Sequence, residues 1–144
     1  MARADQQYSS SVSFLPRGRA LVVDQDREDL QAYAGVLQSM GFEVKPFSNY
    51  HEASRCLEEE AADFVFVSQG TRAFEARVVV ERALAVNRHT PVVVMAPSLD
   101  IGCYLEAMQL GAADYVEKPL APADMEYLVT THSQPQVTAM HRTA

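Results

Sequence analysis

Five short apolar runs alternate with five segments of helical periodicity along most of this chain, and no other feature of the sequence constrains the fold as strongly. The apolar runs predict strands over residues 20–23, 42–47, 63–67, 91–96 and 113–118. The intervening and final segments predict helices over about residues 27–40, 50–60, 74–86, 99–110 and 122–132. Strict alternation of this kind predicts an α/β fold with a parallel sheet, right-handed crossovers and helices on both faces.

Residues at the ends of these segments agree with the assignment. Asp26 is positioned to cap the first helix, and Gly41 is positioned to end it. Ser48 or Asn49 can cap the second helix in the same way. Pro46 lies near the end of the second strand, which favours an edge position because proline has no amide hydrogen to donate.

The composition restricts the classes of function. Of 144 residues, 48% are hydrophobic, which suffices for one core. No apolar run approaches the ~18 residues that span a bilayer, and no apolar signal segment opens the chain, so we expect a cytoplasmic protein that does not bind membranes. The net charge of −7 argues against direct nucleic-acid binding, which depends on Lys and Arg contacts with phosphate. Cys56 and Cys103 lack metal-ligand spacing and are interpreted as reduced.

The sequence divides into three parts. Residues 1–18 are mostly polar, show no period of helix or strand and predict a flexible leader. Residues 19–132 contain all the periodic segments and are expected to form one domain. Residues 133–144 include Pro135 and predict a flexible tail.

The candidate functional residues follow from this fold class. In open parallel sheets, ligands bind beyond the carboxyl ends of the strands, where the strand order reverses. Those ends carry Asp24 and Gln25 after the first strand, Ser68 after the third, Ala96 at the end of the fourth and Lys118 at the end of the fifth.

Four segments of the chain resemble the receiver domain of response regulators in two-component signalling. They are ALVVDQD (20–26), ADFVFVS (62–68), TPVVVMAPS (90–98) and GAADYVEKPL (111–120). The last is the most specific, since receivers typically close with Gly-Ala-x-Asp-Tyr-x-x-Lys-Pro. The resemblance covers about residues 19–132. It implies a flavodoxin-like five-stranded parallel sheet of order 2-1-3-4-5, and a cis peptide bond before Pro119.

The resemblance also implies a set of site residues, which this chain matches only in part. Receivers use a pair of acids after the first strand to hold Mg²⁺, an Asp after the third strand to take the phosphoryl group, a Thr or Ser after the fourth, and a Lys after the fifth. These positions fall on Asp24 and Gln25, Ser68, Ala96 and Lys118. Asp24 and Lys118 match the pattern, and so does Tyr115 at the aromatic switch position.

Each departure removes part of the phosphorylation chemistry. Ser68 offers a neutral hydroxyl, which needs a base to become a nucleophile, and no histidine is expected near it. One carboxylate and one amide make a weak Mg²⁺ site, so we expect metal binding to be weak or absent, with Asp24 as the only candidate ligand. Ala96 has no hydroxyl to link a phosphoryl group to Tyr115. The sequence therefore predicts a non-enzymatic pseudo-receiver that regulates by protein contact.

The retained residues have two interpretations each. Lys118 either contacts a bound anion or partner, or forms a salt bridge with Asp24 that neutralises the pocket, and we favour the bridge. Tyr115 is either a switch or an ordinary half-buried aromatic residue. Tyr104 and Met108, with Tyr115, Met125 and Tyr127, fall on the helix 99–110, strand 113–118 and helix 122–132, whose surface serves dimer and partner contacts in the family. The expected partner is a sensor kinase, an output protein or a second copy of the chain.

Two alternative functions remain open at this point. One is a working receiver in which Ser68 or Asp24 takes the phosphoryl group. The other is a sensor of a small anion or metabolite, bound in a pocket formed by Asp24, Ser68, Ala96 and Lys118. The chain is expected either to act alone through a partner or to be part of a longer regulator.

Overall fold

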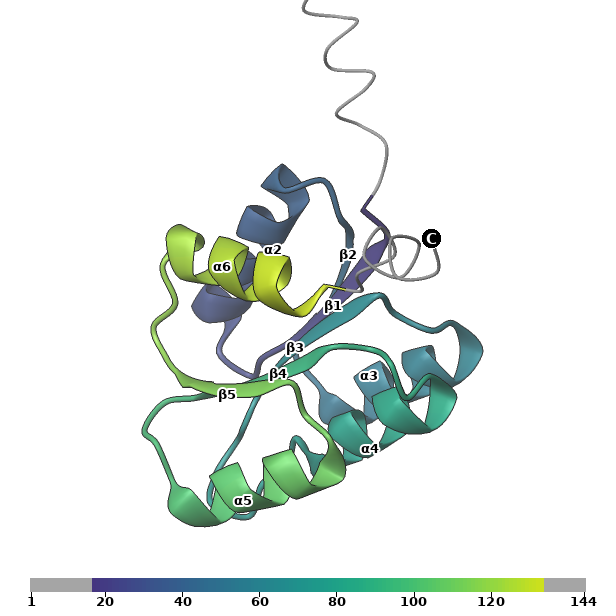
Figure 1. Cartoon of the computed structure of the whole chain (residues 1–144). Helices are drawn as coiled ribbons and strands as arrows, with labels where there is room; N and C mark the ends of the chain where they lie inside the picture. The colour runs from purple at the N-terminus through teal and green to yellow at the C-terminus, as the bar shows by residue number, and fades with distance from the viewer. Residues whose placement is uncertain (1–16, 134–144) are drawn as a thin grey trace, which may run out of the picture.

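The structure is a computed structural model, and it describes residues 17–133. The predicted elements are present. The strands are β1 (Arg19–Val23), β2 (Glu43–Phe47), β3 (Phe64–Ser68), β4 (Val92–Ala96) and β5 (Asp114–Glu117). The helices are α2 (Arg27–Ser39), α3 (Tyr50–Glu59), α4 (Arg77–Val86), α5 (Ile101–Leu110) and α6 (Pro122–His132). Helices α2 and α6 cover one face of the sheet, and α3, α4 and α5 cover the other (Figure 1).

The five strands form one parallel sheet of order β2-β1-β3-β4-β5, which confirms the predicted fold. The register brings the carboxyl ends of the inner strands to one level. Val23 of β1 lies opposite Val67 of β3, and Ser68 lies opposite Met95 of β4. Between β4 and β5, Ala96 at the end of β4 lies opposite Glu117 at the end of β5. The residues that follow these pairs, Asp24 and Lys118, therefore lie at the same edge as Ser68.

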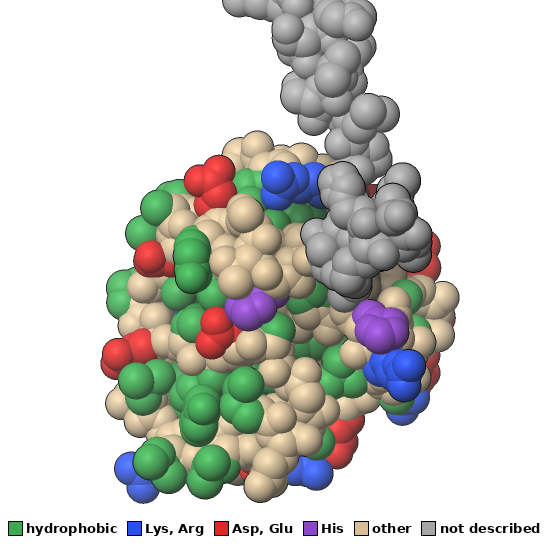
Figure 2. All heavy atoms as spheres, viewed as in Figure 1, with side chains coloured by type: hydrophobic (Ala, Val, Ile, Leu, Met, Phe, Trp, Pro, Cys, Tyr) green, Lys and Arg blue, Asp and Glu red, His purple; other side chains and the backbone are tan. Residues whose placement is uncertain are grey.

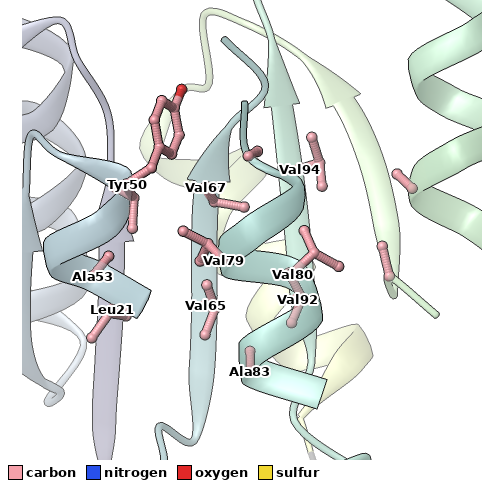
Figure 3. Packing of buried hydrophobic residues seen from close by; sticks show 14 of the residues in the cluster. Leu21, Tyr50, Ala53, Val65, Val67, Val79, Val80, Ala83, Val92 and Val94 are labelled. Carbon is pink, nitrogen blue, oxygen red and sulfur yellow. The ribbon is translucent and has the colours of Figure 1, made fainter. Parts of the chain in front are cut away.

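The core has two layers, one on each face of the sheet. Strands β3 and β4 are buried on both faces, which explains their continuous apolar runs. One layer contains the apolar faces of α2 and α6 together with Phe64 and Phe66. The other contains Val65 and Val67 packed with residues of α3 and α4, including Val79 and Val80 (Figure 3). Burying each such aliphatic side chain contributes about 1.5–3 kcal/mol.

Polar caps fix the starts of three helices. The carboxylate of Asp26 accepts a hydrogen bond from the amide of Asp29, and Asn49 caps α3 through the amide of Glu52, so both predicted caps are confirmed. Asp100 caps α5 through the amide of Cys103, which the sequence alone had not indicated. These caps satisfy amides that have no partner within the helix.

The segment after β3 differs from the prediction. A helix was expected from residue 74, but α4 begins at Arg77 because a turn occupies the preceding residues. The carboxylate of Glu75 accepts hydrogen bonds from the amide and hydroxyl of Thr71. Gly70 has a φ of 88°, and a Cβ there would collide with the side chain of Glu75. This closed turn holds the chain immediately after Ser68.

The ends of the described region are tied to the domain. The amide of Arg17 donates to the carbonyl of Gly41, and the carbonyl of Gly18 accepts from the amide of Glu43. Residues 1–16 and 134–144, where most of the predicted leader and tail fall, lie outside the described residues. The Lys118–Pro119 bond is cis, as the resemblance implied. None of the helices between residues 17 and 133 has the length and apolar character needed to span a membrane.

Candidate functional site

The residues predicted from the strand ends lie together at the carboxyl edge of the sheet. Asp24 follows β1 and is 2% exposed, and Ser68 ends β3 and is 6% exposed. Ala96 ends β4 and is fully buried. Lys118 follows β5, and its amide donates to the carbonyl of Ala96. Gln25, by contrast, is exposed in the loop before α2.

Lys118 forms the predicted salt bridge with Asp24. Its Nζ lies 2.8 Å from Oδ2 of Asp24 and 2.7 Å from Oδ2 of Asp29. Burial lowers the pKa of Lys118, but the hydrogen bonds and charges of the two carboxylates outweigh burial and raise that pKa above its usual value. The ammonium group is therefore charged and held between two acids.

Asp29 is a site residue that the sequence pattern did not single out. It lies in the first turn of α2, where an acid complements the helix dipole. The available signal was its position, because the first turn of α2 opens at the edge where Asp24 lies. Topology alone places the turn there, whereas the contact with Lys118 depends on the side-chain conformation.

The donor groups at this edge do not form the oxygen set that Mg²⁺ prefers. Both carboxylate oxygens of Asp24 are engaged, Oδ2 with Lys118 and Oδ1 with the amide of Asp26 at 3.0 Å. Gln25 supplies an amide where the resemblance implies a second acid, and Ser68 supplies a hydroxyl. Mg²⁺ is usually held by one or two carboxylates with free oxygens. Across residues 17–133, no group of three or more His, Cys, Asp or Glu side chains is arranged to hold a metal ion.

Ser68 has no base to activate it within the described part of the chain. None of the hydrogen bonds in residues 17–133 joins its hydroxyl to an acidic or histidine side chain, and its carbonyl accepts from the hydroxyl of Tyr50 at 2.9 Å. Burial, with the charges of Asp24 and Glu75, raises the pKa of Tyr50 to about 12. Tyr50 therefore stays protonated at neutral pH and acts here as a hydrogen-bond donor.

Tyr115 points into the protein and is tied to two neighbouring segments. Its hydroxyl donates to Oε1 of Gln69 at 2.5 Å and accepts from the amide of Asp100 at 3.0 Å. Gln69 follows Ser68 and is buried, and its carbonyl accepts from the amide of Ala76. Burial raises the pKa of the Tyr115 hydroxyl. Tyr115 thus links the end of β5 to the turn after β3 and to the start of α5.

The roles of Gln69 and Asp100 were not apparent from the sequence. Gln69 directly follows β3, but its partner Tyr115 lies 46 positions away. A glutamine after an apolar run is usually solvent-exposed, so burial is what distinguishes this one. No pattern of neighbouring residues in the sequence indicates a contact between residues so far apart in the chain.

Only some of the side chains expected on the contact surface are exposed. Tyr104 and Met108 are exposed on α5, and Tyr104 packs edge-on against Tyr115 with 5.8 Å between ring centroids. Tyr127 on α6 is also exposed. Met125 is fully buried in the core beneath α6, and Tyr115 is 8% exposed, so neither contributes side-chain surface there. Met125 faces inward because α6 packs its Met125, Leu128 and Val129 side against the sheet, so the expectation that it contributes to the contact surface is wrong.

Comparisons with known proteins agree with the resemblance. A family model described as the response regulator receiver domain matches residues 20–130. The chain is 28% identical over 107 residues to the transcriptional regulatory protein PrrA of Mycobacterium tuberculosis, covering 74% of this chain and 46% of PrrA. It is 27% identical over 100 residues to the C4-dicarboxylate transport transcriptional regulatory protein DctD of Rhizobium meliloti, covering 69% of this chain and 22% of DctD. The chain thus spans less than half the length of these relatives.

A solved structure shows the same fold. The CheY-like receiver domain protein of Methanospirillum hungatei superposes with a TM-score of 0.73 at 20% identity, over 78% of this chain and 90% of that chain. With the parallel sheet of order 2-1-3-4-5 and the family match over most of its length, the chain belongs to the response regulator receiver domain family of two-component signalling.

Proposed function

We propose that this chain is a pseudo-receiver, which keeps the receiver fold and regulates a partner protein in the cytoplasm by contact, without taking a phosphoryl group. The observation that carries the proposal is Ser68. It occupies the end of β3 beside Asp24, where receivers have the acceptor carboxylate. A hydroxyl is a weak nucleophile unless a base removes its proton, and residues 17–133 provide no hydrogen-bonded base.

The charge balance of the site supports the same proposal. An acceptor site for a phosphoryl group needs a metal ion to offset the repulsion between an anionic donor and the carboxylates. Here the single Lys118 ammonium pairs with both Asp24 and Asp29 and offsets part of their charge. Each oxygen of Asp24 already accepts one hydrogen bond, Oδ2 from Lys118 and Oδ1 from the amide of Asp26, so a metal ion would compete with the Lys118 charge for this carboxylate. We therefore infer that Mg²⁺ binding is weak or absent.

The residues at positions 96 and 115 support the proposal that the domain keeps a single conformation. Ala96 has only a methyl group, so it offers no hydroxyl to sense a phosphoryl oxygen. Tyr115 instead has both hydrogen-bond partners of its hydroxyl within the protein, Gln69 and Asp100. The inward position of Tyr115 thus depends on internal contacts alone. In this proposal the domain presents one conformation to its partner.

A small-anion sensor at this edge is less well supported. An anion would need Lys118 as its charged ligand, but that ammonium is held by two carboxylates at 2.8 and 2.7 Å. The nearby cleft of about 470 Å³ is lined by Gln25 of the loop before α2 and by residues at the starts of α3 and α4, including His51 and Arg77, together with the carboxylates of Glu75 and Glu81. These carboxylates disfavour an anion.

The test is phosphoryl transfer from a small donor. The full chain is incubated with acetyl phosphate and Mg²⁺, and its intact mass is measured. The positive control is the triple variant Gln25→Asp, Ser68→Asp and Ala96→Thr, which restores the missing side chains on the same fold. We expect no mass change in the native chain and the added mass of one phosphoryl group in the variant. A Mg²⁺-dependent phosphoryl adduct on the native chain would overturn the proposal.

A further inference from the structure

A polar pocket lies at the amino ends of the strands, at the opposite edge of the sheet from Asp24, Ser68 and Lys118. Its lining comes from the segments that directly precede β1, β2, β3 and β4 and from the last residues of α6, whose end lies beside the start of β1 in Figure 1. No described lining residue belongs to α5, whose hydrophobic side chains gather at the lower left of Figure 2. The pocket has a volume of about 420 Å³, which is in the range of sites for small molecules.

The carboxylate of Asp63 is held in a fixed position at this pocket. Its Oδ2 accepts a hydrogen bond from the amide of Arg19 at 2.7 Å, and the amide of Asp63 donates to the carbonyl of Arg19 at 2.8 Å. Gly18 has a φ of 109°, and a Cβ there would lie 2.2 Å from Oδ2 of Asp63, so glycine leaves room for the carboxylate. Within the described chain, Oδ1 of Asp63 accepts no hydrogen bond, and it is available to a cationic group.

A cationic side chain, that of Arg17, lines the same pocket. Its guanidinium lies over the ring of Phe42, 6.0 Å from the centroid, and forms no ion pair with another described residue. Arg17 and Asp63 are the only Lys, Arg, Asp or Glu side chains among the described lining residues, and His89 is the other titratable one. The pocket therefore presents one positive and one negative group that do not pair with each other.

The remaining lining offers neutral polar groups beside apolar ones. Thr90 is 5% exposed, and its hydroxyl donates to the carbonyl of Ala62 at 3.3 Å, so the hydroxyl oxygen can still accept. The side-chain oxygen of Asn87 accepts from the amide of His89 at 2.9 Å, so its NH₂ group can still donate. Ala62 and Pro91 add apolar contacts. This lining suits a small molecule with two polar ends and a short apolar body.

We propose that this pocket binds a small zwitterion of the α-amino-acid class, with its carboxylate on Arg17 and its ammonium group on Asp63. A guanidinium recognises a carboxylate through two parallel N–H donors, and a carboxylate pairs with an ammonium group at short range. A simple anion would be repelled by Asp63, and a simple cation by Arg17, whereas a zwitterion satisfies both. The inference goes beyond the proposed function, because the pocket lies away from Ser68 and needs no phosphoryl chemistry.

The test is binding to the full chain, followed by two-dimensional amide NMR. The probes are the genetically encoded L-amino acids, each added singly at millimolar concentration. We expect at least one of them to shift the amide resonances of residues 62–64 and 87–90 in a saturable way, while those of residues 24, 68 and 118 stay in place. No saturable shift with any probe would overturn the inference, and so would shifts centred on residues 24, 68 and 118.

Matched analogues of the amino acid that binds most tightly test the need for both charges. One analogue is the amine that lacks the carboxylate, and the other is the carboxylic acid that lacks the amino group. We expect each to bind more weakly by a factor of about ten or more, because each leaves one charged group of the pocket unpaired. An analogue that binds as tightly as the amino acid would rule out a zwitterion as the ligand class.

Variants separate this site from the general charge of the protein. Asp63→Asn removes the negative charge, and its amide oxygen can still accept from Arg19, so the fold is kept. Arg17→Gln removes the positive charge. The controls Arg27→Gln and Glu28→Gln remove exposed charges at the start of α2, at the opposite edge of the sheet. We expect affinity to fall by a factor of about ten or more in the first two variants and to stay unchanged in the controls. Equal losses in all four would show non-specific attraction and overturn the inference.

Intact mass after acetyl phosphate treatment reports separately on the proposed function. A phosphoryl adduct with unchanged amino-acid binding would refute the pseudo-receiver and keep this site. Absence of both an adduct and amino-acid binding would keep the pseudo-receiver and refute the site.

Discussion

The hydroxyl of Tyr115 lies 2.5 Å from Oε1 of Gln69, which ties the aromatic residue of β5 to the residue that follows Ser68. Both side chains are buried. The same hydroxyl accepts a hydrogen bond from the amide of Asp100, the residue that caps α5. One side chain therefore connects the site edge with the start of α5, and its position depends on contacts within the protein.

The first prediction concerns this pair. Gln69→Leu removes the nearer acceptor of the buried Tyr115 hydroxyl and leaves it only the carbonyl of Asp100 at 3.3 Å, so we expect a loss of about 1 kcal/mol of unfolding free energy in urea denaturation. Tyr115→Phe removes the hydroxyl and leaves Oε1 of Gln69 and the amide of Asp100 without this partner, with a loss of similar size. The double variant should lose clearly less than the sum, because the two residues contact one another. Strict additivity of the two losses would show that the pair is not coupled.

The second prediction concerns the ion pair at the site. Lys118→Met leaves Asp24 as a buried carboxylate without a cation, so we expect a loss of about 3 kcal/mol of unfolding free energy. Asp29→Asn removes the more exposed partner and should cost less than about 1 kcal/mol. Urea unfolding at neutral pH measures both. A larger loss for Asp29→Asn than for Lys118→Met would contradict the assigned roles.

The fold could be predicted from the sequence because short-range patterns carry it. The alternation of strands and helices, the caps at Asp26 and Asn49, and the glycine that ends α5 all act over a few residues. The start of α4 was misplaced because the turn closed by Thr71 and Glu75 replaces the first helical turn, and its hydrogen bonds have no signature in hydrophobic periodicity.

The sequence predicted which residues lie at the candidate site, but it did not predict their side-chain contacts. Strand register brings Asp24, Ser68, Ala96 and Lys118 to one edge, and the strand ends had indicated these four residues. The second acid of Lys118 and the partners of Tyr115 depend on side-chain conformations across distant segments. Asp29 and Gln69 were visible as residues near strand or helix ends, but their contacts were not.

The third prediction concerns stability at high pH. The pKa values of Tyr50, Tyr115 and Lys118 are all raised in the folded protein. For each group the folded state holds its proton more tightly, so its contribution is complete below the unfolded pKa, about 10, and is lost as pH rises through the folded pKa. We expect the urea midpoint to fall above about pH 10. Tyr50→Phe should make this fall shallower, whereas Tyr127→Phe, which alters an exposed ring, should not. An unchanged slope in Tyr50→Phe would contradict the assignment.

The last prediction concerns metal. Mg²⁺ stabilises a protein only through preferential binding to the folded state, by an amount that grows with the ratio of metal concentration to Kd. In the native chain the Lys118 ammonium pairs with Asp24, and Gln25 supplies no second carboxylate, so neither millimolar Mg²⁺ nor a chelator should move the melting temperature. In the triple variant Gln25→Asp, Ser68→Asp and Ala96→Thr, two added carboxylates repel Asp24 and Asp29. We expect that variant to melt below the native chain without metal and to recover with Mg²⁺. A Mg²⁺-dependent rise in the native chain, absent in Asp24→Asn, would show that Lys118 yields its carboxylate to the metal and that the site remains a metal site.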